Sequence, residues 1–210
     1  MSIDFPPFLQ YICNGKDKQN MITFTDYFPK VIFVHRYSSP CGELLLGEFD
    51  NKLCLCDWVA EKHHDRVVRR LKRELNAAVC RLYSGSPVRG KSVGRDLLNQ
   101  ADEQLDEYFA GRRREFDVPL LFVGTDFQKR VWNELLRIPY GETLSYGEIA
   151  RRIGMPTAVR AVANANGANA LSIFAPCHRV IGSDGSLTGY GGGMDAKRYL
   201  LALEQPRLFG

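Results

Sequence analysis

The sequence has no long apolar run and no segment with the pattern of a secretory signal. Its first residues include Asp4, Pro6 and Pro7, without a basic start and an apolar core behind it. No stretch combines the length and the apolarity that a membrane-spanning helix needs. We therefore expect a cytoplasmic protein without a membrane partner.

A concentrated charge of one sign is also missing. The formal net charge is +4; residues 1–115 carry 18 basic and 16 acidic side chains, and residues 116–210 carry 10 and 8. Each part therefore has a net charge of +2. This balance permits binding to nucleic acid but does not by itself predict it.

Paired cysteine motifs are absent, although the chain has six cysteines. A reducing cytosol favours free thiols over a disulfide framework. We expect Cys54 and Cys56 on one face of a strand, and His35, His63 and His64 follow or precede them closely enough to suggest zinc. However, Cys-x-Cys lacks the usual two-to-four-residue ligand gap and a second cysteine pair. We therefore interpret both cysteines as core residues and predict no metal site.

Apolar periodicity predicts a mixed α+β fold. Short apolar runs over residues 31–34, 44–46 and 53–56 are separated by turn residues and predict an antiparallel meander. A 3.6-residue period predicts helices over residues 65–83 and 98–109. The basic side chains of the first helix suggest a solvated face, with DNA contact as the alternative.

The length allows two modest domains. Residues 1–20 are polar towards their end and without periodicity, which predicts a flexible tail. A connector over residues 112–118 places the domain boundary near residue 116. The remaining chain is thus divided into an N-terminal domain, 21–115, and a C-terminal domain, 116–210.

The C-terminal part has the pattern of a helix-turn-helix. After a helix that begins near residue 125, Ser145 opens a capping box of the S-x-x-E form, and Gly154 ends the short helix that follows. Pro156 fits the first turn of a second, alanine-rich helix over residues 157–164. Two short helices joined by a glycine turn are typical of DNA-binding helix-turn-helix units.

Cys177 and His178 are neighbours in the segment Ala-Pro-Cys-His-Arg-Val. The apolar residues of 171–174 before it predict a buried strand that ends at a turn. A lone cysteine is usually a small buried hydrophobe, whereas a reactive one acts as a thiolate and needs a base. Neighbouring side chains of an extended chain point to opposite faces. Either the chain turns at Pro176, or a water carries the proton between the two side chains.

Two more charged residues have unusual settings, one at the end of a helix and one in the alanine-rich helix. Glu204 lies at the end of the last predicted helix, where an acid opposes the helix dipole, and it is a candidate to orient His178 in a Cys-His-Glu arrangement. Arg160 is the long charged residue of the alanine-rich helix. It is either a solvated arginine or a side chain that fills the gap left by an extruded base.

Taken together, these motifs resemble the methylated-DNA–protein-cysteine methyltransferases. The resemblance keeps order and spacing over roughly residues 96–204 and is looser over residues 30–95, where Ser39 to Gly42 match the family's opening hairpin. The matching segments are Phe127-Gln128, Val131-Trp132, Ile138-Pro139, Ser145-Tyr146, Ile149-Ala150, Arg160-Ala161-Val162, Asn169, Pro176 to Val180, Gly189-Tyr190 and Lys197 to Glu204.

The resemblance implies a fold and a reaction. The expected fold is an RNase-H-like N-terminal domain followed by a C-terminal winged-helix domain, whose helix-turn-helix enters the minor groove. The expected reaction is DNA repair by a single, stoichiometric transfer of an alkyl group from O6 of guanine, with O4 of thymine as a further candidate, to Cys177. The resemblance further implies that the protein is a monomer, that it uses no cofactor and that its partner is double-stranded DNA containing O6-alkylguanine.

The resemblance also implies the roles of the catalytic residues. Cys177 would be the nucleophile, and His178 would draw its proton through a water. Glu204 would hold His178, and Asn169 would brace the turn before the cysteine.

A second set of residues would bind DNA and the flipped base. Arg160, with Ala161 beside it, would occupy the base stack, and Tyr146 would help to rotate the nucleotide out. The backbone of Val180 and Cys177 would accept from the guanine amino group, and the loop at Tyr190 and Gly191 would line the other side of the pocket. Phosphate contacts are expected from Lys129, Arg130, Arg151 or Arg152.

Two departures from the family pattern are Ala175, where isoleucine or valine is usual, and Ala170, where proline is common. Neither removes a reacting atom. The main alternative is a damage sensor or regulator of the same fold that binds DNA without reaction. A further alternative is a Cys-His-Glu hydrolase, which would turn over many times.

Overall fold

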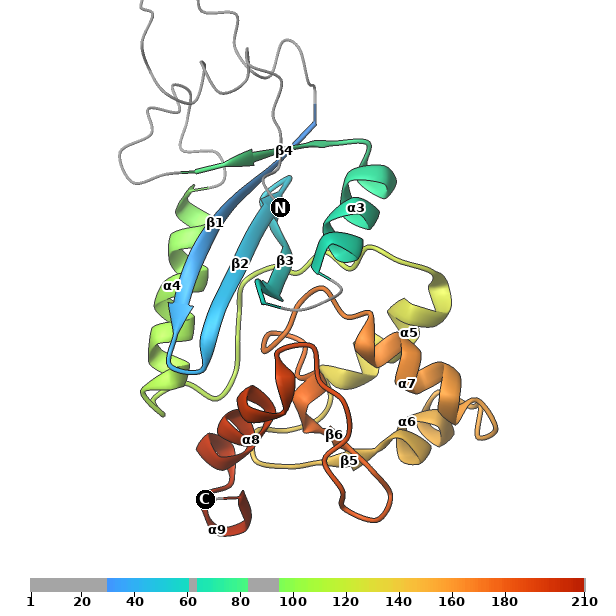
Figure 1. Ribbon diagram of the computed structural model, residues 1–210. Coiled ribbons are helices and arrows are strands. Elements are labelled where there is room, and N and C mark those ends of the chain that lie inside the picture. Colours follow the sequence, from blue (N-terminus) through green and yellow to red (C-terminus); the bar gives the residue numbers. More distant parts are fainter. Residues whose placement is uncertain (1–29, 61–63, 83–94, 210) are drawn as a thin grey trace, which may run out of the picture.

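The computed structural model describes residues 30–60, 64–82 and 95–209, so the predicted tail over residues 1–20 lies outside the described residues. The described chain forms a sheet flanked by helices and a helical C-terminal part beside it (Figure 1). This confirms the predicted mixed α+β class. Among the described helices, none has the length and apolarity to cross a membrane.

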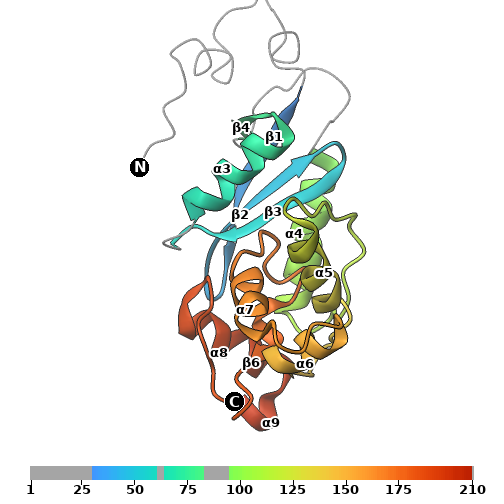
Figure 2. The same ribbon diagram turned by 90° about the vertical axis from the view of Figure 1, so that its right-hand side faces the viewer.

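The sheet has four strands in the order β3-β2-β1-β4. The predicted meander is confirmed, because β1 pairs antiparallel with β2 and β2 antiparallel with β3, while β4 pairs parallel with β1. Helices α3 and α4 cover opposite faces of this sheet (Figures 1 and 2). The bounds are β1 Val31–Ser39, β2 Gly42–Phe49, β3 Lys52–Trp58, α3 His64–Leu75, β4 Ala78–Arg81 and α4 Arg95–Phe109.

Alternation along β1 builds two cores. Val31 and Phe33 pack in the cluster that contains the apolar face of α4, whereas Ile32 and Val34 pack in the cluster that contains α3. This follows from the two-residue period of a strand that is covered on both faces. The sheet therefore has a packed core on each of its faces.

The helix predicted over residues 65–83 is wrong in its second half. Helix α3 ends at Leu75, Asn76 has a positive φ of 47°, and Val79 lies in β4, hydrogen-bonded beside β1. Val79 is buried in the same core as the helix, so the apolar spacing continued across the turn and resembled one longer helix. A tertiary contact, the pairing with β1, decided the strand.

The prediction that Cys54 and Cys56 share one face is also wrong. The pairing of β2 with β3 shifts between Gly47 and Glu48, which pair with Leu55 and Leu53, so Cys54 is the extra residue of a β-bulge. Cys54 therefore packs in the α3-side core and Cys56 in the α4-side core.

The C-terminal part contains the predicted helix-turn-helix, formed by α6 and α7. Thr125 and Ser145 each cap a helix through a capping box, with Gln128 and Glu148 as the partners. The bounds are α5 Asp126–Leu135, β5 Leu144–Ser145, α6 Tyr146–Arg152, α7 Val159–Gly167, the 3₁₀ turn η1 Cys177–Arg179, β6 Val180–Ile181, α8 Gly193–Glu204 and α9 Pro206–Phe209. Helix α7 starts two residues later than predicted, because the Ala158 amide donates to Met155 O in a turn that includes Pro156.

The edge of the sheet holds the segment that leads to Cys177. The amide of Cys56 donates to Ala170 O, and the amide of Ser172 donates to Cys56 O, each at 2.7 Å. The strand predicted over residues 171–174 is not formed, since only Leu171 bridges Cys56 and Ile173 has a φ of 72°. The segment is buried as expected, but it turns on itself instead of extending the sheet.

Candidate active site

A tight turn presents Cys177. The side-chain amide of Asn169 donates to Ala175 O at 2.8 Å, and its Oδ1 accepts from the Leu171 amide at 3.0 Å. After Pro176 the chain enters the 3₁₀ turn η1, so the chain does turn at the proline. Asn169 thus lies across the mouth of this turn and hydrogen-bonds to both of its sides.

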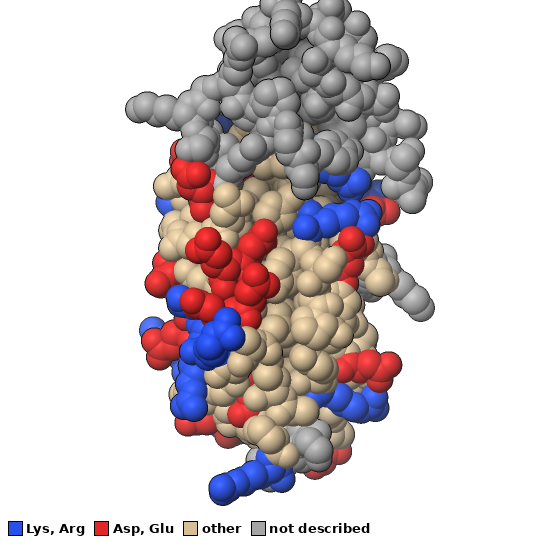
Figure 3. Space-filling view, turned by 90° about the vertical axis from the view of Figure 1, so that its left-hand side faces the viewer, with Lys and Arg blue, Asp and Glu red and all other residues tan. Residues whose placement is uncertain are grey.

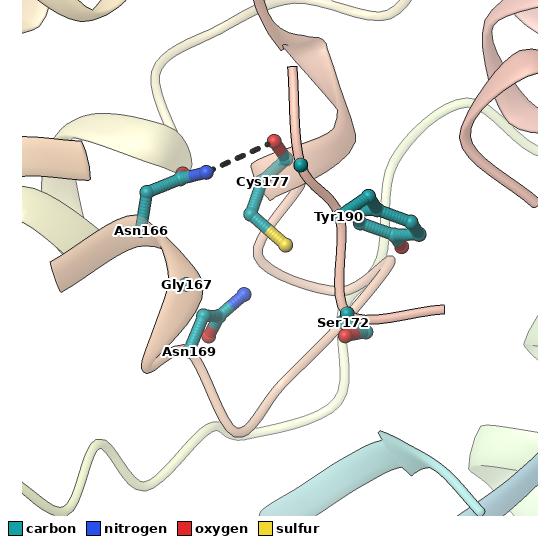
Figure 4. Close-up of a pocket in the computed structure, with 8 residues that line it drawn as sticks. Asn166, Gly167, Asn169, Ser172, Cys177 and Tyr190 are labelled. Atoms are coloured by element: carbon teal, nitrogen blue, oxygen red, sulfur yellow. Dashed lines mark hydrogen bonds between the residues drawn. The ribbon is translucent and has the colours of Figure 1, made fainter. Parts of the chain in front are cut away.

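The Cys177 thiol points into a small pocket. Figure 4 shows its Sγ between the side chains of Asn169 and Tyr190. The pocket is lined by Asn166, Gly167, Asn169, Ser172, Cys177, Gly189, Tyr190 and Gly191. Four of the predicted site residues therefore meet here, namely Asn169, Cys177, Tyr190 and Gly191.

Burial decides the protonation of the thiol. Only 5% of Cys177 is exposed, and burial raises the pKa of its thiol to about 11, although hydrogen bonds from Asn169 and Ser172 and the charge of Lys197 act in the opposite direction. At neutral pH the resting side chain is therefore a thiol. A base must take its proton when it reacts.

His178 is buried and held by Glu204. Its Nε2 lies 2.8 Å from Glu204 Oε1, and because a carboxylate only accepts, Nε2 carries the proton. Its Nδ1 is buried and has no hydrogen-bond partner among the described residues. Burial, with Arg179 and Lys197 nearby, lowers the pKa of His178 despite the pull of Glu204. The imidazole is therefore neutral at pH 7 and has an open acceptor at Nδ1.

Glu204 is the centre of a buried ion-pair network. Arg179 donates from Nε to Oε2 at 2.8 Å and from Nη2 to Oε1 at 3.0 Å, and Tyr108 and the Gly141 amide also donate to the carboxylate. Burial opposes ionisation, but the hydrogen bonds from His178 and Arg179 and the positive charge of Arg179 outweigh it and hold the pKa of Glu204 well below its usual range. The carboxylate is therefore a fixed negative charge.

Lys197 is a site residue to which sequence reasoning assigned no role. Its side chain is fully buried in α8, and its Nζ donates to Val180 O at 2.6 Å and to Thr188 O at 2.9 Å. Burial lowers the pKa of this amine to about 8. The available signal was a lysine on the apolar stripe of the last helix, three residues before Leu200 and seven before Glu204.

The wall opposite Asn169 is held by the sheet. Trp58, the last residue of β3, donates from Nε1 to the Tyr190 hydroxyl at 3.2 Å. A Cβ added at Gly192 would lie 2.6 Å from the Trp58 ring, so the loop needs glycine at this position to pass the indole. No sequence pattern pointed to Trp58, because it is distant in the chain from the residues it supports.

Four of the six residues predicted to bind DNA and the flipped base, namely Tyr146, Arg160, Ala161 and Val180, lie outside the pocket lining. Arg160 and Ala161 are exposed in the first turn of α7, and Arg160 makes no hydrogen bond or ion pair within the part of the chain that the structure describes. Tyr146 begins α6, and its hydroxyl accepts from Thr188 Oγ1 at 3.0 Å. Val180 is buried, and its carbonyl already accepts from Lys197. The structure thus separates the pocket at Cys177 from the helix-turn-helix surface.

The four basic side chains expected to bind phosphates differ in their exposure and in the internal contacts that they make. Arg130 donates to Ile153 O, and Arg152 approaches Glu134 at 3.4 Å. Arg151 is exposed on α6, and Lys129 is partly exposed on α5. Arg151 is therefore the freest of the four for an external contact.

Sequence reasoning also missed three pocket-lining residues, Asn166, Gly167 and Ser172, and it included Gly189 only as part of a matching segment. Asn166 and Gly167 end α7, and their only signal was their place between the helix-turn-helix and the cysteine turn. Among residues 30–60, 64–82 and 95–209, no group of three or more His, Cys, Asp or Glu side chains is arranged to hold a metal ion. The five described cysteines are free thiols.

Family models match nearly all of the described chain. The ribonuclease-like domain of 6-O-methylguanine DNA methyltransferase matches residues 32–122, and the DNA-binding domain of the same family matches residues 126–206. These matches agree with the predicted RNase-H-like and helix-turn-helix domains. The boundary near residue 116 stays a prediction.

Similar proteins carry related names. A methylated-DNA–protein-cysteine methyltransferase of Mycobacterium tuberculosis is 64% identical over 107 residues, 51% of this chain and 65% of that protein, so the aligned part spans just under two thirds of its length. The crystal structure of the Mycobacterium tuberculosis O6-methylguanine methyltransferase is 43% identical, with a TM-score of 0.67, covering 84% of this chain and 94% of that chain. A crystal structure of the same organism's protein in complex with DNA is 42% identical, with the same TM-score and coverage.

Proposed function

The chain belongs to the 6-O-methylguanine DNA methyltransferase family, and on this premise we propose that it repairs alkylated DNA by taking the alkyl group onto Cys177. The proposed substrate is O6-alkylguanine in double-stranded DNA, with O4-alkylthymine as a further candidate. The names of the relatives and the DNA complex of one of them support this substrate class.

The observation that carries the proposal is the chemistry around the thiol. Cys177 points into a pocket, and the next residue is a neutral imidazole with an open Nδ1 and a carboxylate on its other nitrogen. This is the arrangement of a nucleophile, a base and an orienting acid. A resting thiol that is activated only on demand fits a protein that reacts once.

The proposed reaction is one in-line displacement. His178 takes the Sγ proton through a water, and Glu204 stabilises the imidazolium that forms. The Sγ–C bond forms as the C–O6 bond breaks, and the electron pair of that bond leaves with guanine. A proton or hydrogen bond delivered to the leaving base lowers the barrier to its departure. The thioether on Cys177 is stable, so each molecule reacts a single time.

The remaining predicted residues would bring the base to the thiol. Arg160 and Ala161, exposed on α7, would enter the minor groove, with Arg160 replacing the extruded base in the stack. Tyr146 would guide and hydrogen-bond the base, and the second lone pair of Val180 O would accept from its amino group. Tyr190 would form the wall beside the alkyl group.

We further propose that the protein acts as a cytoplasmic monomer without a cofactor. The free thiols of the described cysteines support a reducing compartment. The displacement itself needs only the thiol, a base and a leaving group, all of which the chain and its substrate supply.

The test is the intact mass of the protein after mixing with a duplex that carries one O6-methylguanine, followed by peptide mapping. We expect one added methyl group, on Cys177, and no second addition with excess duplex. Cys177→Ala should bind the duplex and remain unmodified, whereas Cys41→Ala, at a partly exposed cysteine of the β1–β2 hairpin, should transfer normally. Binding without modification of the unsubstituted protein would instead identify a damage sensor.

A further inference from the structure

A tyrosine of the N-terminal part reaches the carboxylate behind His178. Tyr108, in the last turn of α4, is fully buried, and its hydroxyl donates to Glu204 Oε1 at 2.7 Å. The rings of Phe109, Phe116 and Tyr140 surround it at centroid distances of 5.3–6.2 Å. This packing leaves the phenol little freedom to choose another partner.

Three donors share one carboxylate oxygen of Glu204. Oε1 of Glu204 accepts from His178 Nε2 at 2.8 Å and from Tyr108 at 2.7 Å, with Arg179 Nη2 at 3.0 Å. An oxygen that accepts several hydrogen bonds has less electron density to offer each donor. Tyr108 therefore competes with His178 for the same acceptor.

We propose that Tyr108 is a positioning residue that limits how strongly Glu204 retains a proton on His178. This inference rests on the proposed function, in which His178 must be neutral before it takes the thiol proton. A carboxylate that accepted from His178 alone would favour the imidazolium and delay this step to higher pH. The Tyr108 phenol keeps the Glu204 carboxylate charged, but it weakens the extent to which this carboxylate favours the imidazolium form of His178.

Other charged and titratable groups surround the pair and are unchanged by a substitution at residue 108. Those near His178 are Cys177, Arg179, Tyr190, Lys197 and Glu204, and those near Glu204 also include Tyr140. Glu204 would retain its bonds to Arg179, His178 and the Gly141 amide without the phenol. A change in the titration of His178 would thus report the lost hydroxyl.

The test compares Tyr108→Phe with Tyr140→Phe. The Tyr140 hydroxyl donates to the Leu203 backbone carbonyl at 3.1 Å and not to the carboxylate, so it is a matched control. The measurements are the NMR titration of His178 and the rate at which iodoacetamide alkylates Cys177 as a function of pH. Neither measurement uses DNA, so failure of methyl transfer in the unsubstituted protein would be recognised separately.

We expect Tyr108→Phe to raise the midpoint of the His178 titration by about one pH unit, because a lost hydrogen bond to a charged group has an energy of that order. The acid limb of the plot of Cys177 alkylation rate against pH should shift upward by the same amount. Tyr140→Phe should leave both midpoints in place. If Tyr108→Phe instead lowered the alkylation rate of Cys177 equally at every pH and left the His178 midpoint unchanged, the tyrosine would only support packing. That result would overturn the proposal.

A second substitution keeps the test valid if Tyr108→Phe does not fold. Incorporation of 3-fluorotyrosine at residue 108 nearly preserves volume and makes the phenol a stronger donor. We expect it to move the His178 midpoint to lower pH, opposite to the phenylalanine variant. An unchanged or higher midpoint would contradict the competition for Oε1.

Discussion

Cys177 combines a reactive element with a protective environment. Its thiol is buried, and its pKa of about 11 leaves almost no thiolate at neutral pH. Oxidants and adventitious electrophiles react with the thiolate, so a buried thiol is spared from them. In the proposed reaction, activation of the thiol depends on His178 and on a substrate that fills the pocket.

Lys197 illustrates how a buried cation can organise a site without touching its pocket. Its ammonium binds the carbonyls of Val180 and Thr188, which lie on opposite sides of the loop that follows η1. The same charge lowers the pKa of the Cys177 thiol relative to burial alone. Lys197 thus joins the segment after η1 to the loop at Thr188 through hydrogen bonds, and its charge acts on the Cys177 thiol.

Glu204 should determine part of the acid stability. Its pKa is held well below the ordinary value of 4.5, so the unfolded state binds more protons than the folded state. Its contribution is complete above about pH 4.5 and is lost as the pH falls below that value. Between pH 7 and pH 3 the unsubstituted protein should lose about 2 kcal/mol more unfolding free energy than Glu204→Gln.

Urea unfolding of both proteins across this pH range measures the difference. The stability gap between them should narrow as the solution becomes acidic. Parallel curves would mean that Glu204 has the same proton affinity in the folded and unfolded states, which is incompatible with the observed network.

At the scale of elements, β3 belongs to the sheet but also builds the site. Its Cys56 backbone pairs with the turn at Ala170 and Ser172, and its Trp58 supports Tyr190. An edge strand offers free backbone groups to a neighbouring segment. Here that segment is the turn before Cys177, so the sheet restricts the position of the proposed nucleophile.

Helix α7 presents Arg160 to the outside without an internal partner in the described structure, which predicts a role in extrusion of the base. Arg160→Ala should slow methyl transfer from duplex DNA by roughly 10- to 100-fold, because a few kcal/mol of unstacking would go uncompensated. Transfer from free O6-methylguanine base needs no extrusion and should change little. Single-turnover rates with both substrates check this.

The matched control for Arg160 is Arg198→Ala, on α8, where the guanidinium pairs with Asp195 on the exposed surface. It should affect neither substrate. Equal loss with duplex and free base in Arg160→Ala would reject the role in extrusion and point to a general defect of the pocket.

At the scale of the whole molecule, charge is distributed unevenly. Acidic side chains gather along α4, on the face seen in Figure 3, which lies away from the helix-turn-helix. They include Asp102, Asp106 and Glu107. Phosphates are disfavoured beside this acidic group.

Duplex affinity should therefore fall as salt rises, with log K decreasing by about 0.9 per phosphate contact for each unit of log salt. Arg151→Ala, at the freest of the candidate phosphate contacts, should reduce the slope by about one. Arg112→Ala, which removes an exposed charge after α4, should leave the slope unchanged. Fluorescence anisotropy between 50 and 200 mM salt, roughly, measures both; a flat response would argue against DNA as the partner.

The sequence by itself determined the local elements and the candidate reacting residues of the proposed function. The helix start near Thr125, the capping box at Ser145, the apolar run over residues 31–34 and the Cys177-His178 pair lie in short segments, because they depend on neighbouring residues only. These patterns were sufficient to predict the mixed α+β class, the meander and the helix-turn-helix.

Only the tertiary structure decided the features that join distant segments. The bulge at Cys54, the strand at Val79, and the contacts of Trp58 and Tyr108 with the site depend on partners up to 132 residues away. The same holds for the titration of Cys177 and Lys197, since burial is a property of the whole fold. A sequence pattern reports local periodicity, whereas packing sets pKa values and selects which side chains meet.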